Sequence, residues 1–137
     1  MKIFAFKVKA DPRGSLVAIE QERDIPFEIK RVYYMYNINN NAVRGCHAHK
    51  KLKQVIICLH GKCSVLLDNG YNKEIVELSD PFIGLYIAPE IWHEIYECSQ
   101  DSVIISLASD YYDESDYIRN YNDFKDYIKY SEEETKL

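Results

Sequence analysis

This 137-residue chain lacks cysteines that are spaced for metal binding, although it contains four. They form no C-x-x-C pair and no zinc-finger pattern, which argues against a zinc ribbon or a dithiol redox site. No apolar run approaches the roughly 18 residues that a membrane helix needs. The first residues are too short and too interrupted for a secretory signal. We therefore expect a cytoplasmic protein with no membrane partner, whose thiols are reduced and mostly structural.

Positive charge is also in deficit. The chain has 17 Lys and Arg against 22 Asp and Glu, a formal net charge of -5 and a pI near 5.4. Nucleic-acid binding requires a broad basic face, so this balance argues against a nucleic-acid partner. Tyrosine is abundant instead, with 12 copies against five Phe and one Trp. Its bulk and polar tip suit a barrel interior or a wet interface.

Short apolar segments separated by turn residues fill most of the chain. Strands are predicted at residues 3–9, 15–20, 29–36, 42–49, 53–59, 62–67, 74–78, 84–88, 91–97 and 103–108. Turn signals recur between them, for example Asp11-Pro12-Arg13-Gly14 and Asp68-Asn69-Gly70. Turns every 8–12 residues favour an all-β sandwich or barrel over βαβ units. The length favours one domain, residues 1–137.

A helical period occurs only near the C-terminus. Apolar residues recur there at roughly i, i+4, i+7 and i+11: Tyr117, Ile118, Tyr121, Phe124 and Ile128. This stripe predicts a helix at about 113–130, with Asp113 or Ser115 as the N-cap. Residues 131–137 are highly charged, and we expect them to fray.

Two of the four histidines, His47 and His49, are spaced i, i+2. In an extended strand alternate residues share a face, so both imidazoles are expected to point the same way. Arg44 precedes them and Lys50 and Lys51 follow. In an acidic chain this is a concentrated positive patch, and we expect the rest of the fold to hold it over a pocket.

An H-x-H pair suits either a metal site or proton transfer. Cupins hold a divalent ion with H-x-H, a downstream Glu and a later His. Here Gln54, a weak ligand, occupies the place of the Glu, and the spacing from Pro89 to His93 is one residue short. Proton transfer fits better, because imidazole titrates near neutrality and Arg44 can stabilise a phosphate or an oxyanion. A purely structural role for both histidines stays open.

The chain resembles a family of small enzymes along nearly its whole length. The most specific motif is RGCHAHKKL at 44–52, in which Cys46 replaces the usual aromatic residue. Further motifs are IKRVYY at 29–34, Gln54 before an apolar strand, VLLDNG at 65–70, PFIGLYI at 81–87, Pro89-x-x-Trp92 and YDESDYIR at 112–119. Together they are similar to the sugar 3,4-ketoisomerases that act on dTDP-linked 4-keto-6-deoxyhexoses. These are cupin-like proteins related to the dTDP-4-keto-6-deoxyglucose 3,5-epimerases.

The resemblance implies a cupin-type jelly roll (double-stranded β-helix) with a C-terminal helix, acting without metal or cofactor. It implies an isomerase that moves the ketone of the hexose from C4 to C3 through an enediol or enediolate. His47 and His49 would be the acid–base pair, with His49 slightly favoured as the base at C3, and Tyr33 a second proton carrier. The implied substrate-binding residues are Arg31, Arg44, Gln54, Lys51 and Trp92. His93 and Arg119 are weaker candidates.

The implied partners are the dTDP-linked 4-keto-6-deoxyhexose and a second copy of the chain in a homodimer. The 3-keto product would feed an aminotransferase on the way to 3-amino-3,6-dideoxy sugars of surface polysaccharides. Three alternatives stay open: a 3,5-epimerase, a metal-dependent cupin, and a non-catalytic nucleotide-sugar-binding module. Core packing is an equally good interpretation of Tyr33 and Trp92.

Overall fold

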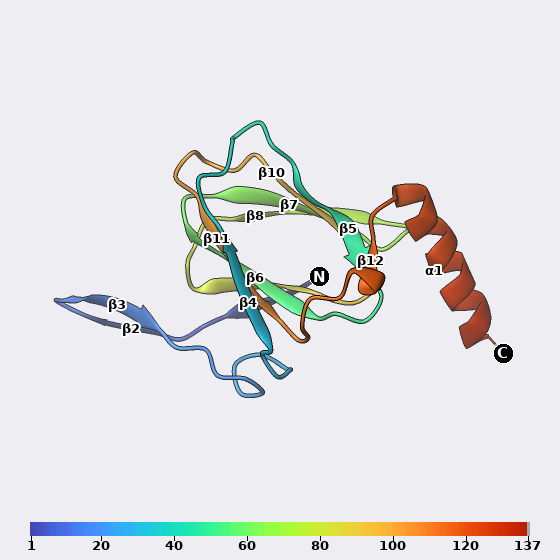
Figure 1. Ribbon diagram of the computed structural model, residues 1–137. Coiled ribbons are helices and arrows are strands. Elements are labelled where there is room, and N and C mark those ends of the chain that lie inside the picture. Colours follow the sequence, from blue (N-terminus) through green and yellow to red (C-terminus); the bar gives the residue numbers. More distant parts are fainter. Residues whose placement is uncertain (137) are drawn as a thin grey trace.

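Two five-stranded antiparallel sheets face each other in the computed structural model, which describes residues 1–136 (Figure 1). The first has the order β1 (Lys2–Ala5), β9 (Ile83–Ile87), β6 (Gln54–His60), β11 (Val103–Ala108) and β4 (Arg31–Met35). The second has the order β12 (Tyr117–Ile118), β5 (Arg44–His49), β10 (Trp92–Tyr96), β7 (Cys63–Asp68) and β8 (Lys73–Leu78). The predicted all-β jelly roll with a C-terminal helix is confirmed.

The core lies between the two sheets, and a second apolar cluster covers the outside of the first. Alternate residues of β6 serve the two clusters. Ile56 and Cys58 face the core, whereas Val55 and Ile57 pack in the outer cluster with Phe27. Because both faces of β6 are covered, its sequence is a continuous apolar run and not an alternating one.

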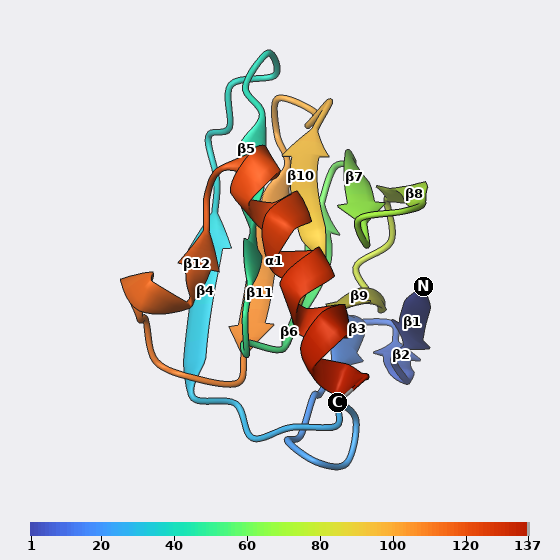
Figure 2. The same ribbon diagram turned by 90° about the vertical axis from the view of Figure 1, so that its right-hand side faces the viewer.

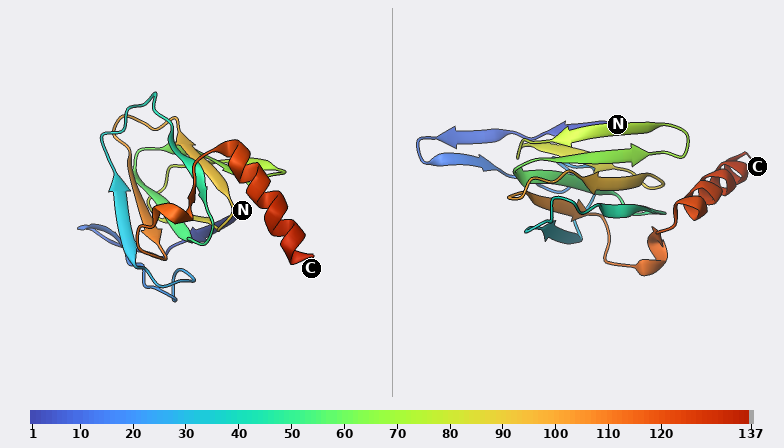
Figure 3. Two further views of the ribbon diagram at one scale, coloured as in Figure 1. Left: turned by 45° about the vertical axis from the view of Figure 1, so that its right-hand side comes forward. Right: turned by 90° about the horizontal axis from the view of Figure 1, so that it is seen from above.

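β2 (Val8–Asp11) and β3 (Gly14–Val17) form a hairpin that extends away from the two sheets (Figure 3). The strand predicted at residues 3–9 is therefore divided, because β1 joins the edge of the first sheet and β2 leaves it. Nearly every side chain of the hairpin is exposed, and Leu16 is 57% exposed. A two-stranded hairpin is at best marginally stable alone in water.

The C-terminal helix begins later than the sequence predicts, so the predicted bounds of 113–130 are wrong. Asp113 caps a 3-10 turn, η1 (Glu114–Asp116), which is followed by β12. The helix α1 (Tyr121–Thr135) is capped by Asn120, whose side chain accepts a hydrogen bond from a backbone N–H of the first turn. The prediction was wrong because the apolar stripe runs through two elements, β12 and α1.

In the first of these, Tyr117 and Ile118 pair with His49 and Ala48 of β5. The later members of the stripe belong to α1. The helix also continues through Thr135, where fraying is predicted; residue 137 lies outside the described residues.

α1 lies across the outside of the second sheet (Figure 2). Phe124 and Ile128 are buried there against Ala48 and Trp92. Among residues 1–136, no helix is long and apolar enough to cross a membrane.

Candidate active site

A bulge in β5 sets the position of the histidines. Gly45 and Cys46 have φ values of +82° and +59°. β10 pairs His93 with His47 and the next residue with Gly45, so Cys46 is the extra residue of a bulge. A Cβ at position 45 would lie 3.0 Å from the carbonyl oxygen of His93. Glycine therefore allows the two strands to approach and brings His47 beside His93.

Three imidazoles meet between β5 and β10. The ring centroids of His47 and His49 are 4.9 Å apart, as their shared face predicts. His93 lies 4.5 Å from His47 and 6.4 Å from His49, although the sequence indicates it only as a weaker candidate. Within residues 1–136, no group of three or more His, Cys, Asp or Glu side chains has a geometry that could hold a metal ion.

His47 presents an unpaired nitrogen. Its Nδ1 lies 3.0 Å from the carbonyl oxygen of Gly45, which can only accept, so Nδ1 carries the hydrogen and Nε2 carries the lone pair. Nε2 is buried and has no hydrogen-bond partner among the described residues. Burial lowers the pKa of His47 below its usual 6.5, so the ring is neutral at pH 7. A neutral imidazole with a free Nε2 is a general base.

His49 is held by a carboxylate that the sequence analysis did not assign. Asp116 of η1 lies 3.1 Å from His49 Nδ1 and also accepts the backbone N–H groups of Lys51 and Leu52. Burial, followed by the neighbouring His47, lowers the pKa of His49 to about 4, and Asp116 opposes this shift. Asp116 belongs to the motif at 112–119, so the motif was visible in the sequence although the pairing was not.

Tyr117 was also missed. Its ring lies 4.8 Å from His47 and 4.3 Å from His49, and the guanidinium carbon of Arg119 lies 4.2 Å above the same ring. η1 and β12 therefore deliver Asp116, Tyr117 and Arg119 to the histidines as one segment.

The first sheet brings a phenol to the site. The Tyr33 hydroxyl donates to Oε1 of Gln54 at 3.0 Å, and Ser106 donates to the same oxygen at 3.0 Å. Gln54 is fully buried, and its Nε2 has no partner among the described residues. Gln54 thus lies behind Tyr33 and orients its hydroxyl. Burial raises the pKa of Tyr33, which keeps the phenol protonated.

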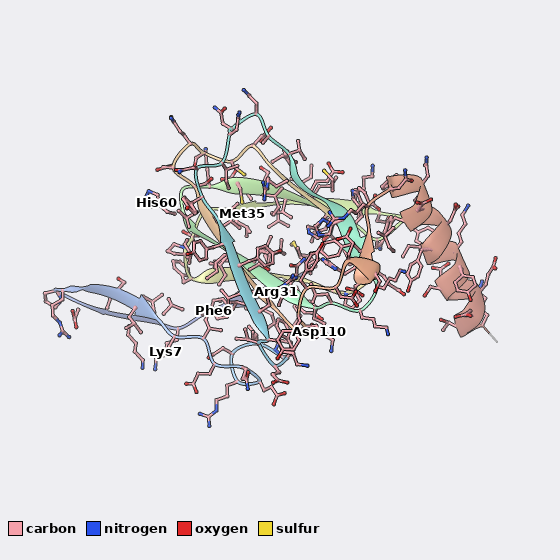
Figure 4. All side chains as sticks on the ribbon, in the orientation of Figure 1. Phe6, Lys7, Arg31, Met35, His60 and Asp110 are labelled. Atoms are coloured by element: carbon pink, nitrogen blue, oxygen red, sulfur yellow. The ribbon has the colours of Figure 1, made fainter. Side chains whose placement is uncertain are left out.

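These groups surround a cavity of about 460 Å³ between β4, β5, β10 and β12. Arg31 and Met35 extend into the site region from the same face of β4 (Figure 4). The lining residues include three arginines and no Asp or Glu: Arg31, Tyr33, Met35, Val43, Arg44, Gly45, His47, His93, Ile95, Tyr117 and Arg119. The cavity is therefore a cationic pocket that contains a base and a phenol.

Three predicted substrate-binding residues lie outside this cavity: Gln54, which is buried behind Tyr33, Lys51 and Trp92. Lys51 follows the end of β5 and lines a smaller hollow of about 170 Å³ with Asp110, Asp113 and Asp116. Trp92 precedes His93 in β10 and so faces the other side of the sheet. Its indole is buried 5.8 Å from Phe124, and its Nε1 donates to the side chain of Glu94.

Two further features lie away from the histidines. His60 is at the opposite end of the sheet from Arg31, where it pairs with Asp101 on the surface, as its place beside a turn predicts (Figure 4). A hollow of about 350 Å³ opens beside β1, β7 and β9, with Lys2, Asp68 and Tyr86 among its lining residues. Neither contributes to the cationic pocket.

Comparison with known proteins identifies the family of the chain. The family model of FdtA (WxcM-like, C-terminal) matches residues 1–129. The TDP-4-oxo-6-deoxy-alpha-D-glucose-3,4-oxoisomerase of Aneurinibacillus thermoaerophilus is 54% identical over 127 residues, which are 93% of this chain and 91% of that protein.

Among solved structures, a mutant of the 3,4-ketoisomerase QdtA from Thermoanaerobacterium thermosaccharolyticum, in complex with TDP-4-keto-6-deoxyglucose, has 46% identity and a TM-score of 0.92 over 93% of each chain. NovW, a 4-keto-6-deoxy sugar epimerase of Streptomyces spheroides, shares the fold, with 17% identity and a TM-score of 0.71 over 84% of this chain and 66% of its own. The chain therefore belongs to the FdtA family and is an isomerase related to the sugar 3,4-ketoisomerases, which confirms the resemblance that its motifs predict.

Proposed function

We propose that this protein is a dTDP-4-keto-6-deoxyglucose 3,4-ketoisomerase, which moves the carbonyl group of the hexose from C4 to C3. The observation that carries the proposal is the cavity itself. It combines the unpaired Nε2 of neutral His47, the protonated phenol of Tyr33 and three guanidinium groups, with no carboxylate among its lining residues. The substrate is inferred from the relatives, whose names give TDP-4-keto-6-deoxyglucose or its synonym TDP-4-oxo-6-deoxyglucose; TDP here denotes dTDP.

The first step is the removal of the hydrogen at C3. The C4 carbonyl acidifies this hydrogen, and His47 Nε2 takes it as a proton. The electron pair of the C3–H bond then forms a C3–C4 double bond, and the oxygen at C4 becomes an enediolate oxyanion. Arg31 or Arg44 stabilises this charge, because a guanidinium fixed near a developing oxyanion acts on the transition state more than on the substrate.

Three proton transfers follow and leave the ketone at C3. Tyr33 gives its phenolic proton to the oxygen at C4 and takes the proton of the oxygen at C3. The imidazolium of His47 returns its proton to C4. Each proton that leaves the sugar is replaced and no electrons are lost, so the reaction balances without an external oxidant or reductant.

The geometry supports His47 and not His49 as the base at C3. His47 lines the cavity, whereas His49 is 4% exposed and lines the neighbouring hollow. His49 Nδ1 is engaged by Asp116. We therefore assign the proton transfers at C3 and C4 to His47. The role that we assign to His49 is to influence the charge state of the neighbouring His47.

The arginines of the cavity are the proposed ligands of the diphosphate, with Arg31 and Arg44 as the principal pair. Gln54 acts through Tyr33. Lys51 and Trp92, which lie outside the cavity, have no part in substrate binding in this proposal.

A 3-keto product is the carbonyl that an aminotransferase would convert into a 3-amino-3,6-dideoxy sugar. We propose this place in the biosynthesis of polysaccharide sugars, and with it a cytoplasmic location. The pathway is supported by the substrate in the name of the relative. The location is supported by the four cysteines, all of which are free thiols.

A homodimer is also proposed. The hairpin β2–β3 extends from the body (Figure 3). Val32 and Tyr34 on the outer face of edge strand β4 are 52% and 63% exposed, and Tyr36, just after the strand, is 63% exposed. A second copy of the chain would cover these exposed apolar side chains and the open edge of the sheet.

Light scattering should give the mass of two chains. Leu16→Asp in the hairpin should shift the mass toward one chain, whereas Ser15→Asp should not; a monomeric native protein would contradict the proposal.

Incubation with dTDP-4-keto-6-deoxyglucose, followed by NMR, tests the function. The expected result is a new ketone at C3 and a hydroxyl at C4. A ketone that stays at C4 while C3 or C5 inverts would identify an epimerase instead. Binding of the nucleotide sugar without any change would identify a binding module.

A further inference from the structure

Ser106 places a buried hydroxyl in an otherwise apolar strand. It lies in β11, whose sequence is VIISLA, and its side chain is fully buried. Burying a hydroxyl costs free energy unless the group is hydrogen-bonded, so a serine at this position indicates a use for its hydrogen. Ser106 is not among the residues that line the cavity. Its part in the reaction is therefore exerted through another residue.

The residue directly opposite Ser106 is Tyr33. β11 and β4 are antiparallel, and their register pairs Ser106 with Tyr33. Residues directly opposite each other have Cβ atoms roughly 4.5–5.5 Å apart on the same face of the sheet. Gln54 of the neighbouring strand β6 completes the group, because its Oε1 accepts from the Tyr33 hydroxyl and from Ser106 Oγ, each at 3.0 Å. Two hydroxyl groups thus meet at one carbonyl oxygen.

This arrangement suits a phenol at position 33 but not a phenolate. In the proposed reaction Tyr33 gives its proton to the oxygen at C4 before it takes one from the oxygen at C3, so the side chain carries a negative charge in between. The Oε1 atom of Gln54 can only accept hydrogen bonds, and its lone pairs then face this charge. The phenolate therefore needs a donor from elsewhere in the group.

Ser106 has a hydrogen that can serve both acceptors in turn. A hydroxyl hydrogen turns about the Cβ–Oγ bond, so it can leave Gln54 Oε1 for the Tyr33 oxygen without movement of the backbone. Burial raises the pKa of Tyr33, and a hydrogen bond from Ser106 opposes this shift. Gln54 Nε2 is also buried without a partner among the described residues, but it reaches the phenolate only if the whole amide turns over.

We infer that Ser106 is a positioning residue for the proton transfer at oxygen, which donates to Gln54 while Tyr33 is a phenol and to Tyr33 while it is a phenolate. The O–H bond of Ser106 stays intact throughout, so the proton balance of the reaction is unchanged. The inference rests on the proposed function, because it takes the phenolate from that mechanism.

Ser106→Ala, which removes only the hydroxyl, tests this role through the pKa of Tyr33. The tyrosines are replaced by fluorotyrosine and titrated by fluorine NMR, and the signal of Tyr33 is the one that disappears in Tyr33→Phe. Ser106→Ala should raise the pKa of Tyr33, with a fall in its acid dissociation constant of about 10- to 100-fold, as expected for the loss of one hydrogen bond to a charged group. The other groups that act on this phenol are the same in both proteins: Arg31, Arg44 and Tyr117.

The rate of ketone transfer in a single turnover of the unlabelled protein gives the second measurement. Ser106→Ala should lower this rate by about 10- to 100-fold and keep the native affinity for TDP. Ser106→Cys, which keeps a weaker donor of similar size, should fall between the native protein and Ser106→Ala in both the pKa and the rate.

Ser102→Ala is the matched control. Ser102 is also buried, but it precedes β11 at the end where Val103 pairs with His60, away from the cavity. This variant should keep the native pKa of Tyr33 and the native rate.

An unchanged pKa of Tyr33 in Ser106→Ala would overturn the inference alone, and so would a raised pKa with a native rate of ketone transfer. If Ser106→Ala does not fold, native values of both quantities in Ser106→Cys would overturn it. A native protein that transfers no ketone would overturn the proposed function as well, and that result needs no variant.

Discussion

Tyr33 and Tyr34 are neighbours in β4 with opposite environments. Tyr33 faces the cavity and its hydroxyl donates to Gln54, whereas Tyr34 is 63% exposed on the outer face of the strand. The alternation of strand side chains accounts for the difference, and it applies equally to His93 and Trp92 in β10. Residue type alone therefore does not identify a functional tyrosine or tryptophan.

We predict that Tyr33→Phe, which removes only the hydroxyl, lowers kcat by a factor on the order of 10²–10⁴, because no group then moves the proton between the sugar oxygens. The affinity for TDP should be unchanged. Steady-state kinetics and calorimetry measure the two quantities. Tyr34→Phe is the control and should keep native activity. A Tyr33→Phe kcat close to native would remove Tyr33 from the mechanism.

The sequence predicts those site residues whose positions depend on local spacing. His47 and His49 share a face because they are spaced i, i+2 in β5, and Arg44 lies in the same motif. Asp116 and Tyr117 were missed because η1 and β12 return to β5 after more than 60 residues, and no local pattern reports such a pairing.

At the scale of elements, β5 depends on its bulge. Gly45 has a positive φ and lies close to the backbone of His93, so this position serves both the conformation of β5 and its distance from β10. At the start of the C-terminal helix, by contrast, the apolar pattern led to a wrong assignment of the element. There the apolar period is continuous although the backbone changes from strand to helix between Ile118 and Tyr121.

Gly45→Ala is predicted to damage the site more than the fold. The positive φ should cost about 1–2 kcal/mol and the contact with His93 about 1–3 kcal/mol more. The strands would move apart, so kcat should fall at least tenfold by our argument from geometry. Gly14→Ala is the control: its φ is +143°, but nothing lies within 4 Å of the added Cβ. Equal losses of stability and activity in the two variants would contradict this role for Gly45.

At the scale of the whole molecule, the spacing of turns predicted the two-sheet architecture, since each turn ends a strand that runs once along the length of its sheet. The burial of the histidine cluster could not be predicted in this way, because it depends on how the second sheet closes over the first. It has a consequence for stability, since the folded state has to keep three imidazoles neutral.

The free energy of unfolding should therefore depend on pH. Burial lowers the pKa of His47, His49 and His93, so below about pH 6.5 the unfolded chain binds more protons than the folded one. Stability should then be lost as the pH falls from about 6.5 to 4. His49 alone, with its pKa lowered to about 4, should remove about 2 kcal/mol between pH 7.5 and 5.

Urea unfolding at a series of pH values measures this dependence. His60→Asn, which removes an exposed histidine, should keep the native slope. A free energy of unfolding that is flat or rises as the pH falls from 6.5 to 5 would show that the cluster is not buried as described.

The central claim is that His47 takes the hydrogen from C3. It is tested most directly by the rate at which deuterium leaves C3 of a substrate labelled there, followed by NMR. The native protein should lose the label as the 3-ketone forms, and His60→Asn should do the same. His47→Asn should lose it slower by a factor on the order of 10²–10⁴ while still binding TDP. Loss of the label at the native rate in His47→Asn, with the rate abolished in His49→Asn, would contradict the account.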